Sequence, residues 1–148
     1  MSYIQDNLLP SEKIKYEGKV HSFYIFIMSF LAFIGFLFFF GGIKSGTWFM
    51  GFAIIIPTLY HVFYMVTTEI AVTNKRVLYK TGIIARNIFE LQLDKTESAT
   101  LDQTIFQRII GAGTLVVNGT GGHNKPIQYL ANPSEMRTII YSEIEESK

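Results

Sequence analysis

The 148-residue sequence contains no cysteine, which excludes disulfide bonds, thiolate catalysis and metal sites built from cysteine ligands. It also lacks a basic excess, since 13 Lys and Arg stand against 12 Asp and Glu. Base-rich stripes of the kind that bind nucleic acid are absent, so we expect no nucleic-acid partner. The three histidines, His21, His61 and His123, show no metal-ligand spacing. We therefore predict no metal site and no cofactor.

Charge is almost absent from residues 22–68, where Lys44 is the one charged side chain. The apolar runs on either side of it each exceed the roughly 20 residues that a helix needs to cross a bilayer's hydrocarbon core. The alternative is a pair of buried helices in a soluble protein. A domain of this size rarely commits so much chain to two helices that are apolar on all sides. The sequence predicts a transmembrane helical hairpin over residues 22–68.

The distribution of bases around the two spans predicts their orientation. The glycine-rich turn between them carries Lys44 alone, whereas the other side carries Lys15, Lys19, Lys75, Arg76 and Lys80. Cytoplasmic flanks are enriched in Lys and Arg. We expect a two-span protein of the cell membrane with both termini in the cytoplasm. Ser29, Ala32 and Gly35 lie at helical spacing in the first span, which favours close contact between helices.

The second half of the chain reads as short strands and a terminal helix. Alternating runs separated by turn residues begin at Glu69, and a further short strand is expected near Ile14. Residues 105–110 predict a turn or two of helix, with Ile105, Ile109 and Ile110 on one face. The final helix begins near Pro133 and places Met136, Ile139, Ile140 and Ile144 on one side. Strands of this length and spacing favour a small barrel or sandwich.

These segments carry motifs that together resemble a known family. They are LLPSEKIKYEGKVH at 8–21, AVTNKRV at 71–77, TGII at 81–84, LDKTES at 93–98, LDQTIFQRIIGAGT at 101–114, GTGG at 119–122 and ANPSE at 131–135. The sequence resembles the bacterial family of short pleckstrin-homology-like (PH-like) domains attached to membrane hairpins. Two departures are Ser22, where the family often has tryptophan, and Ala112, where an aromatic residue is frequent.

The resemblance implies an α+β membrane protein. Its expected parts are a cytoplasmic N-terminal lead-in (1–21), the transmembrane hairpin (22–68) and a cytoplasmic PH-like domain (69–148). That domain is expected to be a split β-barrel of about seven strands, capped by the C-terminal α-helix. The resemblance brings no catalytic motif, so we predict that the protein is not an enzyme.

The basic residues that follow the second span are the main candidates for a binding site. Lys75, Arg76, Lys80 and Arg86 fall in the first hairpin of the predicted domain, where eukaryotic PH domains hold phosphoinositides. They are candidates for contact with anionic lipid headgroups. The interpretation that we favour over a specific headgroup pocket is that these charges set the topology of the spans and attract the membrane non-specifically.

Three other features have a structural and a functional interpretation. His61 is an ionisable group inside a span and a candidate intramembrane polar site, or else a neutral imidazole hydrogen-bonded within the hairpin. Gly119–Gly122 suits a hairpin turn better than a phosphate loop, because a strand and not a helix follows it. Asp94, Glu97 and Asp102 are typical of a solvated strand edge.

We therefore predict a membrane-tethered, non-enzymatic module for binding or assembly at the inner face of the cell membrane. Its expected partners are membrane lipids, another membrane protein or further copies of itself. One alternative is a homo-oligomeric structural protein. Another is an accessory or immunity protein that modulates membrane permeability or membrane-active peptides.

Overall fold

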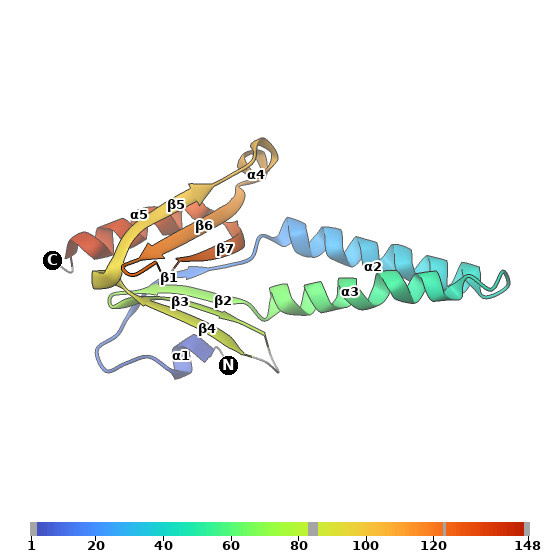
Figure 1. Ribbon diagram of the computed structural model, residues 1–148, viewed down its shortest axis with the longest axis horizontal. Coiled ribbons are helices and arrows are strands. Elements are labelled where there is room, and N and C mark those ends of the chain that lie inside the picture. Colours follow the sequence, from blue (N-terminus) through green and yellow to red (C-terminus); the bar gives the residue numbers. More distant parts are fainter. Residues whose placement is uncertain (1–2, 83–85, 123, 147–148) are drawn as a thin grey trace. The chain divides into compact units, whose positions relative to one another are not determined.

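The computed structural model describes residues 3–82, 86–122 and 124–146. Residues 83–85, which include the second half of the TGII motif, and His123 lie outside the described residues. The chain forms two compact units, which Figure 1 shows in sequence colours. One unit, called the hairpin below, is Ser22–Thr67. The other, called the domain, combines Met1–His21 with Thr68–Lys148.

The hairpin consists of α2 (Ser22–Gly42) and α3 (Trp48–Val66), which pack side by side. Both helices are long and apolar enough to span a membrane, judged by length and composition. Large apolar side chains are exposed along both of them, among them Phe26, Phe33 and Ile56. Pro57 is accommodated inside α3 without ending it.

Glycines set the distance between α2 and α3. A Cβ atom added to Gly51 would lie 2.6 Å from the backbone nitrogen of Phe39, and one at Gly35 would lie 2.9 Å from the side chain of Ile55. Gly35 was expected at this contact, but Gly51 was not. Ser29 is exposed and donates its hydroxyl to the Ile25 carbonyl, so it is not part of the tight contact. Small residues therefore permit the approach of the two helices, as in other apolar helix pairs.

The domain contains two antiparallel sheets. The first has the order β1 (Ile14–Gly18), β2 (Glu69–Thr73), β3 (Arg76–Thr81) and β4 (Asn87–Gln92). The second has the order β5 (Thr96–Asp102), β6 (Ala112–Gly119) and β7 (Asn124–Ala131). Because β1 pairs with β2, the lead-in before the hairpin belongs to the same sheet as the residues after it.

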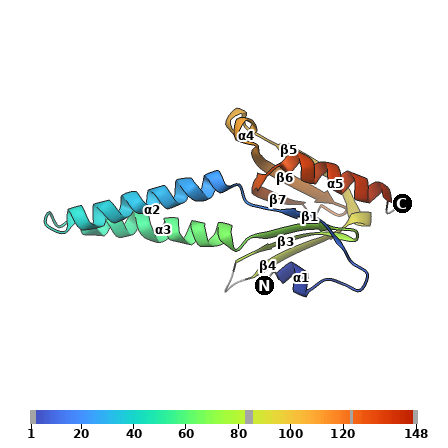
Figure 2. The same ribbon diagram turned by 180° about the vertical axis from the view of Figure 1, so that it is seen from behind.

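Among the residues that the structure describes, four helical segments complete the domain. The short ones are α1 (Tyr3–Asp6), the 3₁₀ turn η1 (Leu93–Lys95) and α4 (Ile105–Ile110). The long one is α5 (Pro133–Glu146), which packs on the sheets as Figure 2 shows from behind. Met136 and Ile140 of α5 are fully buried with residues of both sheets, including Val72, Val77, Leu115, Val117, Ile127 and Leu130.

The two sheets are linked on one side and separate on the other. Val20, just after β1, forms an isolated antiparallel bridge with Leu130 of β7. The Ala131 amide also donates to the Lys19 carbonyl at 2.8 Å. No pairing joins β4 to β5 within the described residues. The described part of the chain thus has seven strands, but they form two sheets, and the single split barrel that we expected is not shown.

The helix contact yields a prediction about packing in the hairpin. We expect Gly51→Ala to destabilise the helix pair by about 1–3 kcal/mol, because its methyl group would overlap the backbone of Phe39. Gly41→Ala is the matched control, since no atom lies within 4 Å of a Cβ placed there. Thermal unfolding of the full chain in detergent, followed by the helical circular dichroism signal, tests this. Equal melting temperatures for the two variants would contradict it.

Candidate binding pocket beside strand β4

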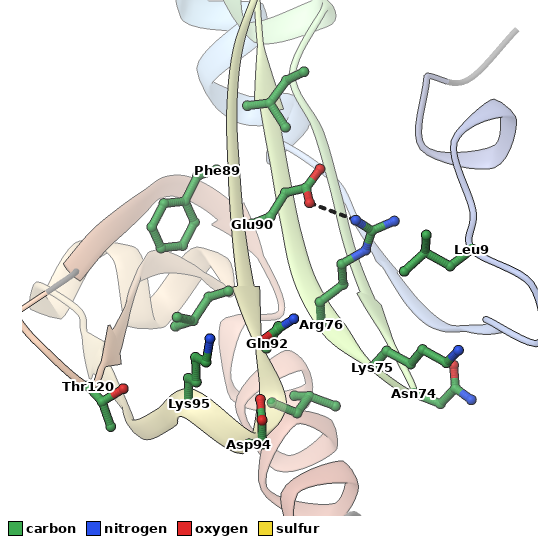
Figure 3. Close-up of a pocket in the computed structure, with 13 residues that line it drawn as sticks. Leu9, Asn74, Lys75, Arg76, Phe89, Glu90, Gln92, Asp94, Lys95 and Thr120 are labelled. Atoms are coloured by element: carbon green, nitrogen blue, oxygen red, sulfur yellow. Dashed lines mark hydrogen bonds and ion pairs between the residues drawn. The ribbon is translucent and has the colours of Figure 1, made fainter.

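A pocket of about 730 Å³ lies along β4 in the domain. Figure 3 shows β4 running through it, with Glu90 turned toward Arg76 and Phe89 on the opposite side of the strand. The walls mix apolar side chains with both signs of charge. They are formed by Leu9, Asn74, Lys75, Arg76, Ile88, Phe89, Glu90, Leu91, Gln92, Leu93, Asp94, Lys95 and Thr120.

Strand β4 is the edge of the first sheet. It pairs with β3 on one side, and no strand pairs with its other side within the described residues. Leu91 is buried and Phe89 is half-buried against the core, whereas Glu90 and Gln92 are exposed. An edge of this kind presents backbone donors and acceptors to an incoming extended chain.

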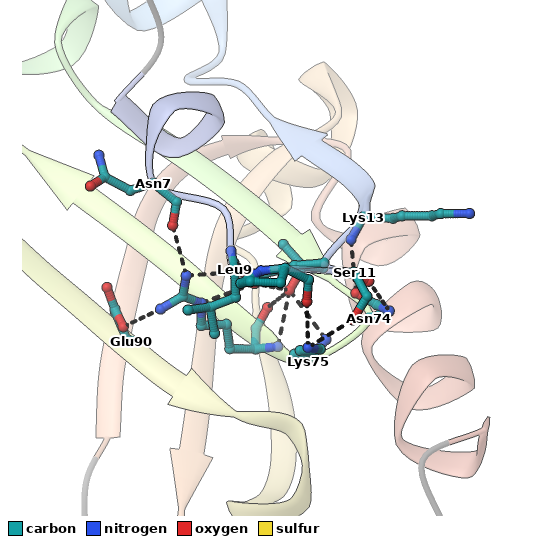
Figure 4. A network of polar contacts seen from close by, with 11 residues as sticks. Asn7, Leu9, Ser11, Lys13, Asn74, Lys75 and Glu90 are labelled. Carbon is teal, nitrogen blue, oxygen red and sulfur yellow. Dashed lines mark hydrogen bonds and ion pairs between the residues drawn. The ribbon is translucent and has the colours of Figure 1, made fainter.

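One wall of the pocket depends on residues 7–13, which we call the N-terminal strap. The strap lies against the β2–β3 turn (Figure 4). Its anchor is Glu12, whose carboxylate accepts hydrogen bonds from Nε and Nη2 of Arg76 at 2.9 and 3.0 Å. The Glu12 side chain is 0% exposed and that of Arg76 is 12% exposed. This ion pair is therefore largely removed from water.

The remaining acceptor capacity of Glu12 is also used. The Thr73 hydroxyl and the Leu9 backbone amide each donate to the carboxylate at 2.7 Å. Arg76 is equally well satisfied, because Nη1 contacts Glu90 at 2.6 Å and Nη2 donates to the Asn7 carbonyl at 3.1 Å. A buried ion pair is tolerated when its other donors and acceptors are satisfied in this way.

Asn74 and Lys75, which precede Arg76 in the β2–β3 turn, hold the rest of the strap. Asn74 exchanges backbone and side-chain hydrogen bonds with Lys13, and its amide group also donates to the Ser11 carbonyl at 3.3 Å. The Lys75 ammonium donates to the Pro10 carbonyl at 3.0 Å and to the Ser11 hydroxyl at 3.2 Å. The TNKR segment therefore fixes the strap and places Leu9 in the pocket wall.

The ion pair shifts the pKa values of both partners. Burial acts to raise the pKa of Glu12, but the hydrogen bonds from Arg76, Leu9 and Thr73 and the Arg76 charge outweigh it, and the pKa is lowered from the ordinary 4.5. The hydrogen bond to Glu12, with the charges of Glu12 and Glu90, raises the pKa of Arg76. The pair stays charged across the neutral range.

The four predicted headgroup residues do not form a free basic cluster. Arg76 is occupied by Glu12 and Glu90, and Lys80 is paired with Glu69 at 2.9 Å with its side chain 11% exposed. Lys75 is exposed but holds the strap. Arg86 is exposed, 5.9 Å from the centre of the Tyr3 ring. Lys75 and Arg76 line the pocket, so half of the predicted set lies at this site.

The other candidates are placed as follows. His61 is exposed on α3, with its ring at 6.0 Å from that of Tyr60. Gly121 and Gly122 have φ of 84° and 79° in the turn between β6 and β7, a conformation that suits glycine. Asp94 lines the pocket, while Glu97 and Asp102 are exposed on β5. In the described residues, no three His, Cys, Asp or Glu side chains form a group that could hold a metal ion.

The charge pair yields a prediction about domain stability. We expect Glu12→Gln to lower the free energy of unfolding by roughly 1–3 kcal/mol, because it leaves a largely buried guanidinium without its main counter-charge. Glu17→Gln is the matched control in the same segment, since Glu17 is exposed and accepts one bond from Gln5. Urea unfolding of the full chain in detergent measures both.

The pH dependence is a further check on that variant. Because the folded pKa of Glu12 is depressed, its contribution is complete above pH 4.5 and is lost as the pH falls through the lower folded value. The Glu12→Gln protein should therefore lose less stability than the wild type below pH 4.5. Parallel losses in the two proteins would refute a charged Glu12 in the folded state.

Comparison with protein families identifies the domain. The model of the bacterial PH domain family matches residues 24–144, which include most of α2, all of α3, β2 to β7 and most of α5. Comparisons with curated proteins and with solved structures gave no match. The family resemblance inferred from the sequence motifs is thereby confirmed. The chain belongs to the bacterial PH domain family.

Proposed function

We propose that the protein is a membrane-tethered, non-catalytic binding module at the inner face of the cell membrane. In this proposal the hairpin is the anchor, and the pocket beside β4 receives an extended segment of a protein partner. The observation that carries it is the outer edge of β4, which lacks a paired strand within the described residues and borders the pocket.

The chemistry of the pocket walls suits a polypeptide. An added strand would form backbone hydrogen bonds with β4, and alternate side chains would enter the pocket. Ile88 is 41% exposed and offers an apolar contact, while Asp94 and Lys95 provide both signs of charge. An anionic headgroup fits this lining less well, because Arg76 is already neutralised by two carboxylates.

The anchor is supported by the hairpin and by the sheet. The two helices satisfy the length and composition required of spans. The pairing of β1 with β2 supports two crossings, because two crossings leave both ends of the hairpin on the same side of a membrane. The excess of Lys and Arg on that side favours the cytoplasm.

Cysteine labelling tests the anchor and its orientation, because the natural chain has no cysteine. We expect Ile43→Cys, at an exposed position between α2 and α3, to react with a membrane-impermeant maleimide in intact cells. Glu145→Cys, exposed on α5, should react only after the cells are opened. The reverse pattern would overturn the orientation. Equal reaction at both sites in intact cells would overturn the two-span anchor.

Site-specific photo-crosslinking in native membranes tests the pocket. A photoreactive residue at Gln92, exposed on β4, should give a discrete protein adduct, whereas the same residue at Gln128, exposed on β7, should not. Ile88→Glu should abolish the adduct by placing a charge on the apolar part of the pocket. Identical patterns at the two glutamines would rule out the pocket as the binding site, and an adduct of twice the chain mass would identify a second copy as the partner.

A further inference from the structure

Helix α4 exposes more apolar surface than any packing role in the domain explains. Ile105, Phe106 and Ile109 are 84%, 54% and 76% exposed, and no residue of this helix is buried. They lie at positions i, i+1 and i+4, which fall on one side of a helix. Ile110, expected on the same face, is instead half-buried.

Both ends of the helix are fixed by capping interactions. The Thr104 hydroxyl accepts from the Gln107 amide at 3.2 Å, and the Gln107 side chain accepts from the Thr104 amide at 2.9 Å, which completes a capping box. Gly111 closes the other end with φ 74°. Since β5 and β6 flank the helix, its apolar side chains are presented on a fixed support.

A chain of contacts within the domain connects α4 to His21 and to the ends of β1 and β2, the strands that continue into the hairpin. Gly111 accepts from the Asn132 amide at 3.0 Å, and the neighbouring Ala131 amide donates to the Lys19 carbonyl at 2.8 Å. The His21 amide in turn donates to the Tyr129 carbonyl at 2.7 Å. Gly18 pairs with Ile70, so both connections to the hairpin leave from neighbouring strands at this end of the domain.

The connections are short enough to restrict this end. Helix α2 begins at Ser22, directly after His21, and only Thr67 and Thr68 separate α3 from β2. Two or three residues reach no more than about 10 Å. If the hairpin spans a bilayer, the end of the domain that carries α4 is therefore confined close to the bilayer surface.

We infer that α4 is an interfacial anchor, which inserts Ile105, Phe106 and Ile109 into the boundary between headgroups and acyl chains of the bilayer that the hairpin crosses. Apolar side chains flanked by bases are typical of helices that lie in this region. Arg108 on α4 and Lys19 at the same end are both exposed and suit anionic headgroups, with Asp102 as the nearby acid on β5. The inference rests on the membrane anchor proposed above.

Single cysteines carrying the fluorophore NBD test this in the full chain, reconstituted in vesicles of phosphatidylcholine and phosphatidylglycerol that contain doxyl-labelled acyl chains. The positions are Ile109 on α4, Ile56 on α3 as the reporter of the span, and Glu145 on α5 as the aqueous control. We expect loss of emission at Ile109 approaching that at Ile56, and little loss at Glu145. Ile105→Glu should restore emission at Ile109 and leave Ile56 unchanged.

The alternative outcomes are distinguishable. Quenching at Ile56 with Ile109 no more quenched than Glu145 would overturn the interfacial anchor and leave the membrane anchor standing. An absence of quenching at Ile56 would overturn both. Emission at Ile109 that responds to mixing with unlabelled chains, and not to the doxyl lipid, would show that α4 packs against a second copy and would also overturn the inference.

Discussion

The ion pair between Glu12 and Arg76 is the interaction on which the architecture of the domain most depends. The partners are 64 residues apart, and the whole hairpin lies between them. Charges removed from water are costly unless every donor and acceptor is satisfied. Here the backbone amide of Leu9, the Thr73 hydroxyl and the Glu90 carboxylate complete the network. The first sheet is therefore built from both sides of the hairpin, and it requires the two flanking segments to meet.

The contacts that hold the strap on the domain also shape the pocket beside β4. The strap carries Leu9 into the wall of the β4 pocket, and the same arginine that fixes the strap also holds Glu90 of β4. Glu90 and Arg76 thus have structural roles at the site where a ligand would bind. The side chains left for recognition include Ile88, Gln92, Asp94 and Lys95. The outer edge of β4 is also unpaired in the part of the chain that the structure describes.

Local patterns in the sequence predicted the elements well, whereas long-range polar contacts were invisible to them. The charge-free runs predicted α2 and α3, and alternation predicted β4, because both signals arise from neighbouring residues. The bases Arg76 and Lys80 suggested lipid contact because their acids, Glu12 and Glu69, are distant or on another strand. The strap has no periodicity, although its PSEK segment and the TNKR segment that holds it were both among the family motifs. The separation of the strands into two sheets depends on β4 and β5 diverging at η1, which no spacing in the sequence encodes.

The strap and α4 are both held in place by hydrogen bonds. The strap places Leu9 in the pocket wall, whereas α4 leaves its isoleucines exposed. The strap is held by hydrogen bonds, with Leu8 packed against Ile4, Ala71 and Leu78, and no residue of α4 is buried. A helix of six residues is too short to persist by propensity alone, so its caps and flanking strands must supply the order. In the strap, hydrogen bonds to the β2–β3 turn hold the chain against the domain. In α4, the capping hydrogen bonds hold the helix without burial of Ile105 and Ile109, which remain exposed. An exposed apolar group that the fold does not need is best explained by a second solvent or surface, and the short connections to α2 and α3 indicate where that surface lies.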